Sequence, residues 1–254
     1  MTTFAVIAGC VGAGAFAILV GLLLFAPRGH RVSRFLIGAT VVSMLWFGAS
    51  AIYYNSPGVL PINIAWLQLL ELLRNALWLL FLARLLDTVG IPAYRRNVRL
   101  TTIVLLAITL CAAVAIAFPY PIQSLLDADQ GQTRKLTLIS ILLVVLGGLI
   151  LIEQLFRNST RDSRWALKHM CFGLGLIFAY DFYLYADAVL FNRVDAAIWN
   201  SRGLVNAMAV PMLAGSASRN RQWQLDIFVS RLVVCYGVPL IAYGGYFMTM
   251  DAAG

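Results

Sequence analysis

Long apolar stretches separated by short polar segments fill most of this chain. A helix needs about 20 mainly apolar residues to cross a bilayer, because the hydrocarbon core is roughly 30 Å thick and a helix rises about 1.5 Å per residue. Short connections such as Pro27–His30 and Asn55–Gly58 separate the stretches, and Pro119 begins the longest loop. The pattern predicts eight spans at approximately residues 3–26, 35–54, 64–86, 100–118, 136–156, 169–191, 196–218 and 229–250.

The apolar stretches indicate helices rather than strands. Lipid cannot hydrogen-bond to backbone N–H and C=O groups, so a spanning segment is either a helix or a strand of a closed barrel. These stretches are about twice the length of a barrel strand and do not alternate between apolar and polar residues. We therefore expect an all-α fold, a polytopic membrane bundle of about eight helices that forms a single transmembrane domain over residues 1–254.

Composition agrees, because 61% of the residues are hydrophobic and 12% are charged, with a mean hydropathy of +0.83. Basic residues collect on the cytoplasmic side of membrane proteins. With the N-terminus outside, the outer side holds Arg134, Lys135, Arg193 and Arg202. Most of the 19 basic residues then lie at the inner face: Arg28, Arg31, Arg34, Arg84, Arg95, Arg96, Arg99, Arg157, Arg161, Arg164, Lys168, Arg219, Arg221 and Arg231. We interpret the net charge of +8 as an anchor to the inner leaflet, with the bilayer as partner and no nucleic acid.

The sequence lacks the patterns of the common membrane enzymes. The four cysteines are scattered and form no Cys-x-x-Cys pair, and neither His30 nor His169 lies in the middle of a span. There is no Gly-x-Ser-x-Gly, His-Glu-x-x-His or phosphate-binding loop. We therefore expect no catalytic residue, no metal site and no cofactor in this chain.

Ionisable residues nevertheless occur inside the predicted spans. Glu71 and Arg74 lie in the third span, and Asp181 and Asp187 lie in the sixth. Such a residue at the bilayer centre costs about 2.5–3.5 kcal/mol on insertion scales unless it finds a partner or water. We therefore expect these side chains to face the interior of the bundle.

Helical spacing groups these residues with further polar neighbours. In the third span Glu71 and Asn75 share a face and Arg74 can reach Glu71, while in the sixth span Asp181 and Tyr185 share a face. All of these residues lie in the outer half or the middle of their spans. The candidate cluster comprises Glu71, Arg74, Asn75, Asp181, Tyr185, Asp187, Arg202 and Asn206.

Two interpretations of this cluster stay open. In the structural one, Glu71 and Arg74 form an internal ion pair and tyrosine hydroxyls bind the two aspartates. In the functional one, the cluster forms a ligand- or proton-sensing pocket that opens to the outer face. Asp181 is then the leading candidate for a titrating group, provided that no cation lies close.

Small residues recur every four positions in the first span, at Gly9, Ala13, Ala17 and Gly21. Small side chains at this spacing allow two helices to approach closely. The stripe predicts either packing within the bundle or a homodimer interface.

The last part of the chain resembles a known family. The segments SRWALKHMCFGLGLIFAYDFYLYADAVLF (163–191), NRVDAAIWNSRGLVNAMAVPM (192–212) and SRNRQWQLDIFVSRLVV (218–234) are similar to the N-terminal membrane region of PrsK-type sensor histidine kinases. These kinases belong to the PEP-CTERM/exosortase system of Gram-negative bacteria. The resemblance is clearest over residues 157–250.

The resemblance implies a signal-input domain in the bacterial inner membrane. In the family, a cytoplasmic kinase that uses ATP follows the membrane region and acts with a response regulator that controls exopolysaccharide genes. The phosphoacceptor histidine and the ATP-binding motifs would then lie beyond residue 254, after one further crossing. A small transporter is the alternative, although no inverted repeat or pair of Gly/Pro-broken helices is visible. A membrane enzyme is disfavoured because the chemical groups it would need are missing.

Overall fold

The computed structural model describes residues 2–24, 31–55, 63–89, 95–126, 129–159 and 161–219. These residues contain helices and no strand, which confirms the all-α fold class. The eighth predicted span, residues 229–250, lies outside the described residues. The helices are α1 (Thr2–Leu24), α2 (Arg31–Asn55), α3 (Ile64–Val89), α4 (Arg95–Ala117), α5 (Pro119–Leu126), α6 (Gln130–Asn158), α7 (Arg161–Phe191) and α8 (Ala196–Arg219).

The segment around Pro119 differs from the prediction. We expected a loop from Pro119 onward, but the short helix α5 begins there, and α6 already begins at Gln130 rather than near residue 136. A capping box explains the early start of α6. The Asp129 carboxylate accepts a hydrogen bond from the Gln132 backbone N–H at 2.6 Å, and the Gln132 side chain accepts one from the Asp129 N–H.

Several helices have the length and composition of membrane spans. Five described segments are long and apolar enough to cross a bilayer: residues 3–24, 34–55, 96–117, 130–158 and 167–191. Large apolar side chains on α4 face outward, among them Leu100, Ile103, Val104 and Leu110, which are 54–66% exposed. Such a surface is unfavourable in water but suits lipid chains. The chain is therefore a membrane-embedded helical bundle.

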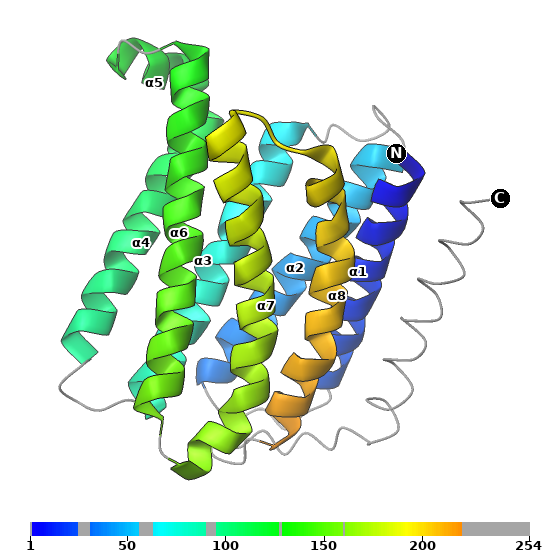
Figure 1. The fold of residues 1–254 in the computed structure, drawn as a ribbon, viewed down its shortest axis with the longest axis vertical. Coiled ribbons are helices and arrows are strands. Elements are labelled where there is room, and N and C mark those ends of the chain that lie inside the picture. Colours follow the sequence, from blue (N-terminus) through cyan, green and yellow to red (C-terminus); the bar gives the residue numbers. More distant parts are fainter. Residues whose placement is uncertain are drawn as a thin grey trace.

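The long helices lie roughly side by side along the long axis of the molecule, and α5 lies at one end (Figure 1). Six of them form a closed ring in which neighbours pack in the order α1, α2, α3, α6, α7, α8 and back to α1. Helix α4 lies outside the ring against α3 and α6. As a result α3 faces α7 and α8 across the interior, where only long side chains can bridge the gap.

Helix α1 packs closely against α2 and α8 through small residues. A Cβ added at Gly203 would lie 1.9 Å from the Ala8 carbonyl oxygen, and one at Gly9 would lie 3.0 Å from the Ala51 Cβ. Ala13 is half-buried against the core, whereas Ala17 is exposed and a Cβ at Gly21 would meet no atom of the described residues within 4 Å. Among the described residues, the first half of the predicted stripe therefore packs inside the bundle and the second half does not.

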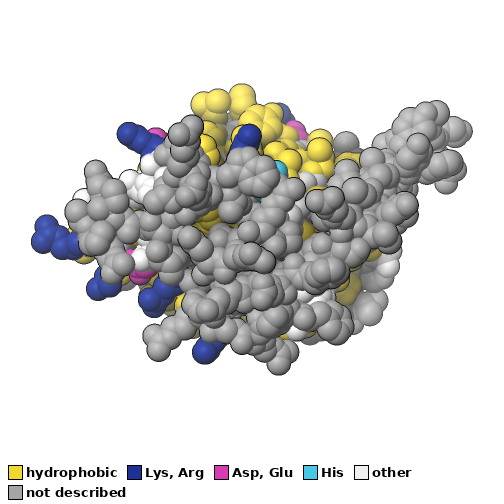
Figure 2. Space-filling model, turned by 90° about the horizontal axis from the view of Figure 1, so that it is seen from below, with side chains coloured by type: hydrophobic (Ala, Val, Ile, Leu, Met, Phe, Trp, Pro, Cys, Tyr) yellow, Lys and Arg dark blue, Asp and Glu magenta, His cyan; other side chains and the backbone are white. Residues whose placement is uncertain are grey.

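The alternating directions of the helices bring most of the described basic side chains to one end. The exposed side chains at this end are Arg34, Arg84, Arg96, Arg99, Arg157 and Lys168. Figure 2 views the molecule from this side and shows Lys and Arg side chains projecting around the rim. Arg134, Lys135 and Arg193 lie at the opposite end, close to α5.

Candidate functional site

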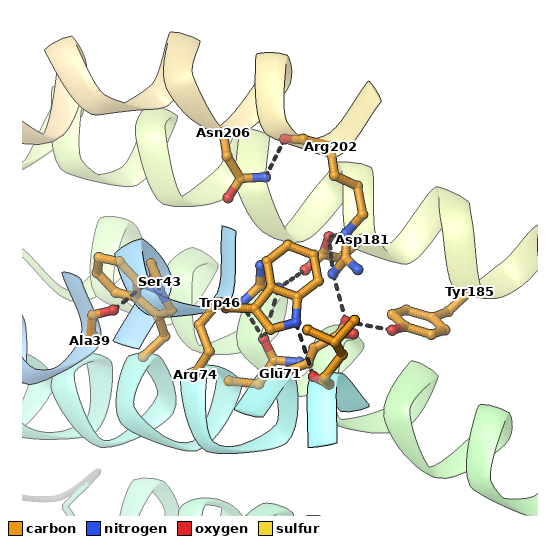
Figure 3. Close-up of polar contacts among 12 residues, drawn as sticks. Ala39, Ser43, Trp46, Glu71, Arg74, Asp181, Tyr185, Arg202 and Asn206 are labelled. Atoms are coloured by element: carbon orange, nitrogen blue, oxygen red, sulfur yellow. Dashed lines mark hydrogen bonds and ion pairs between the residues drawn. The ribbon is translucent and has the colours of Figure 1, made fainter. Parts of the chain in front are cut away.

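Four charged side chains meet in the interior of the ring, and each is 0–1% exposed. Arg202 of α8 lies at the centre, because its Nη2 is 2.6 Å from Glu71 Oε1 and 2.9 Å from Asp181 Oδ1. Arg74 of α3 donates from its Nη2 to Asp181 Oδ2 at 2.5 Å. The two carboxylates and the two guanidiniums balance in formal charge, and together they connect α3, α7 and α8 (Figure 3).

Neutral polar groups complete this charged cluster. The Tyr185 hydroxyl of α7 donates a hydrogen bond to Glu71 Oε1. Asn75 accepts from Arg74 Nε at 3.3 Å and from its Nη2 at 3.2 Å, so it holds the guanidinium in place. Asn206 points to its own helix and donates to the Arg202 carbonyl oxygen at 2.9 Å. Each carboxylate therefore has at least two donors, as burial demands.

Aromatic rings surround the guanidiniums. The Trp46 ring of α2 lies 4.6 Å from the Arg202 Cζ and 4.8 Å from the Arg74 Cζ, measured to the ring centroid. The Trp199 ring lies 4.9 Å from the Arg202 Cζ. Trp46 also donates from Nε1 to the Leu67 carbonyl oxygen of α3 at 3.0 Å. Cation–π contacts of this kind stabilise a guanidinium that water cannot reach.

The sequence analysis did not anticipate the role of Trp46. The signal was present, since tryptophan favours the membrane interface and Trp46 lies in the middle of its predicted span. A tryptophan at that depth needs an acceptor for its indole N–H, which the Leu67 carbonyl supplies. Arg202, which we placed on the outer side when counting charges, is fully buried.

The pairing differs from the expected one. The predicted Glu71–Arg74 ion pair within α3 is wrong, because Glu71 pairs with Arg202 and Arg74 pairs with Asp181. The predicted tyrosine cap on Asp181 is also wrong, because two arginines bind this carboxylate. The helix spacing correctly indicated which side chains face inward, but the partners on α7 and α8 depend on which helices are adjacent.

Two further expectations concern the aspartates. Asp187 is half-buried and takes no part in the ion pairs formed among the described residues. The Asp181 hypothesis required that no cation lie close, and this condition is not met, because Arg74 and Arg202 both contact its carboxylate. The structure therefore gives no reason to single out Asp181 among the buried carboxylates.

A cavity of about 720 Å³ opens next to the cluster, at the end of the bundle where α5 lies. Its wall includes Tyr185 and Trp199, so two residues that contact the charged cluster also face the cavity. Gln68 of α3 and Arg134 of α6 contribute polar groups to the wall. A much smaller hollow of about 20 Å³ touches Arg202 itself, and Tyr54 and Trp199 line both spaces.

The chemistry of the site is that of ion pairing. Among the residues that the structure describes, no three His, Cys, Asp or Glu side chains are placed to hold a metal ion. The Nη1 atoms of Arg74 and Arg202 make no hydrogen bond with a described residue, so both guanidiniums keep donors for other partners. Each Nη1 group can therefore donate to a further acceptor.

Comparisons with models of protein families, with curated proteins and with solved structures find no match for this chain.

Proposed function

We propose that this chain is the membrane-embedded signal-input domain of a bacterial two-component sensor histidine kinase. It crosses the inner membrane eight times with its N-terminus outside and passes a stimulus to a cytoplasmic kinase that lies beyond residue 254. One observation carries the proposal of signal input. Arg202, on the last described helix, binds carboxylates from both α3 and α7, and the neighbouring Tyr185 also faces an open cavity. A ligand in the cavity can thus act on α8 through one side chain.

The buried charges have two ways to pair. In the observed arrangement Arg74 binds Asp181 and Arg202 binds both carboxylates, so α3 is tied to α7 and α8. In the alternative, Arg74 binds Glu71 within α3, three residues away on the same helix, and Arg202 keeps Asp181 alone. In this second arrangement no ion pair joins α3 to α7 or α8. A stimulus that favours one arrangement shifts the population between them.

The stimulus acts on this equilibrium through Tyr185. Its hydroxyl donates to the Glu71 oxygen that also binds Arg202. A ligand that draws the hydroxyl into the cavity removes one donor from Glu71, and the guanidinium of Arg74 can supply the replacement. Helix α8 then changes its contacts with α3, and its far end lies at the basic face of the bundle, the side on which the proposed kinase acts.

The kinase assignment is supported by the resemblance of residues 157–250 to PrsK-type membrane regions. The coding sequence after residue 254 tests it directly. We expect a further hydrophobic segment, then a dimerisation histidine, Gly-rich ATP-binding motifs and a partner response regulator. An open reading frame without these elements contradicts the kinase assignment.

The signalling role is tested by autophosphorylation of the full-length protein in membranes. Tyr185→Phe removes only the hydroxyl bonded to Glu71 and is expected to shift the basal kinase activity several-fold. Tyr183→Phe is the matched control, because Tyr183 lies two residues away on the same helix and is 54% exposed. Equal activity of wild type and Tyr185→Phe with and without stimulus refutes the coupling through Tyr185.

A small transporter is the second candidate, because an open cavity with buried charges beneath it also suits a substrate site. The described helices are continuous, although transporters commonly bind substrate at broken helices. Pro211 lies inside α8 without ending it. Flux measurements in proteoliposomes separate the candidates: solute uptake that depends on the chain and is lost in Tyr185→Phe supports transport, and its absence across solute classes supports sensing.

The proposed orientation has its own test. Single cysteines at residues 96 and 157 should react with a membrane-impermeant thiol reagent only after the cells are opened, whereas one at residue 135 should react in intact spheroplasts. Cys10, Cys111, Cys171 and Cys235 are first replaced by Ala or Ser. Labelling of residue 96 in intact spheroplasts would place this end of the bundle outside and contradict the proposed orientation.

A further inference from the structure

We propose that the cavity at the α5 end of the bundle binds an amphiphile with an anionic head group, taken from the membrane leaflet at that end. Because the cavity shares Tyr185 with the charged cluster, this inference rests on the proposed function and names its ligand class. The volume of about 720 Å³ lies within the range of pockets that bind small molecules and is too large for a single ion.

The charges around the cavity select an anion. Arg134 is the one charged side chain among the described residues of the wall, and it makes no ion pair with a described residue. Asp129 and Asp195, at the starts of α6 and α8, do not line the cavity. They accept hydrogen bonds from the first backbone amides of α6 and α8. An anionic head group at the mouth thus meets a free guanidinium, the geometry that arginine offers to phosphate.

The polar neighbours of Arg134 extend this head-group site. Gln130, Thr133 and Thr137 lie on the same first turns of α6 and line the cavity, and Gln123 of α5 faces it from above. The Thr133 and Thr137 hydroxyls already donate to the backbone carbonyl oxygens of Asp129 and Thr133. The side-chain amides of Gln123 and Gln130 can therefore donate to the oxygens of a head group without adding charge. The arrangement gives the mouth both a cation and neutral donors.

The deeper wall is apolar and suits a hydrocarbon chain. Ala115 and Ile116 of α4 and Leu138 and Ile141 of α6 line this part of the cavity. A soluble anion such as free phosphate would leave these side chains without a partner. An amphiphile covers them while its head group stays near Arg134, so the shape of the cavity favours a lipid-like molecule over a small ion.

The mouth lies at a depth from which a lipid can enter. Phe118, Tyr120 and Trp66 surround this end and are 60%, 77% and 61% exposed. Exposed aromatic residues of this type mark the boundary between lipid chains and water. A ligand from the leaflet can therefore reach the cavity sideways, as an amphiphile requires.

Lipid binding to the purified full chain in detergent micelles tests the proposal. Native mass spectrometry gives the dissociation constants of phosphatidylglycerol and phosphatidylcholine with identical acyl chains, and free glycerol phosphate is added as a competitor. We expect one site that binds phosphatidylglycerol about tenfold more tightly than phosphatidylcholine. This ratio is the effect expected of one charge-assisted hydrogen bond. Glycerol phosphate at millimolar concentration should not displace it.

Two pairs of variants locate the site. Arg134→Gln should remove the preference for phosphatidylglycerol, whereas Lys135→Gln should keep it, because Lys135 is exposed but does not line the cavity. Ala115→Phe fills the apolar part of the cavity and should weaken the binding of both lipids about tenfold. Ala117→Phe introduces the same ring at an exposed position of the same helix and should change neither.

The outcomes are decisive in both directions. Equal affinity for the two lipids, or equal effects of Arg134→Gln and Lys135→Gln, overturns the anionic head-group site. Full displacement by glycerol phosphate, or no effect of Ala115→Phe, overturns the amphiphile in favour of a soluble anion. These results concern binding alone, so they are distinct from a failure of the signalling role, which the autophosphorylation of Tyr185→Phe reports.

Discussion

The charged cluster predicts a large loss of stability for Asp181→Asn. This change keeps the shape of the side chain but removes a charge that contacts two guanidiniums, at 2.5 Å from Arg74 and 2.9 Å from Arg202. Each ion pair with charge centres about 4 Å apart is worth roughly 4 kcal/mol at an effective dielectric constant of about 20. The guanidinium of Arg74 then has no carboxylate partner in a site from which water is excluded.

The expected net effect is smaller than the sum of these attractions. Arg202 keeps Glu71, and the desolvation cost of the Asp181 carboxylate disappears with its charge. Breaking one partner of a buried pair costs about 3–5 kcal/mol. We expect a decrease in the free energy of unfolding within that range, measured by reversible unfolding of the purified chain in mixed micelles.

Two controls make the result interpretable. Glu153→Gln removes an ion pair with Arg157 at 3.2 Å whose side chains are 63% and 75% exposed, so it should cost less than about 0.5 kcal/mol. The double variant Asp181→Asn with Arg74→Gln removes both charges of one pair and should be more stable than Asp181→Asn alone. A loss below about 1 kcal/mol for Asp181→Asn, or strict additivity in the double variant, would refute the coupling.

Three further predictions follow from single contacts. Trp46→Phe removes the indole donor to Leu67 and weakens the contact with both guanidiniums, so it should lower the unfolding free energy by about 1–3 kcal/mol, whereas Trp66→Phe, at a 61% exposed position, should leave it nearly unchanged. Gly203→Ala places a Cβ 1.9 Å from the Ala8 carbonyl oxygen and should cost about 1–3 kcal/mol or more in the same assay, and a neutral result would disprove the close approach of α1 and α8. Gly175→Ala on α7, where an added Cβ would meet no atom of the described residues within 4 Å, should instead stabilise that helix by roughly 0.5–1 kcal/mol, seen as a higher melting temperature.

The membrane character and the helices could be predicted from the sequence with little ambiguity. Hydropathy is a local property, and lipid permits few backbone conformations, so the apolar stretches predict where most of the described helices lie. Helices α6 and α7 begin earlier than their predicted spans, at Gln130 and Arg161, and the early start of α6 follows from the Asp129–Gln132 capping box, which is also a local feature. The inward-facing positions of Glu71 and Asp181 likewise follow from helical spacing and from the cost of exposing charge to lipid.

The pairing of charges could not be predicted in this way. Glu71 and Arg74 are three residues apart and can meet within one helix, yet each binds a residue more than a hundred positions away. Which pair forms depends on the ring order of the helices, which places α3 across from α7 and α8. The same order brings Trp46 into contact with both guanidiniums and puts Tyr185 in the wall of the cavity. Periodicity shows which face of a helix turns inward, whereas the partner on that face depends on packing between helices, a long-range property that no local pattern encodes.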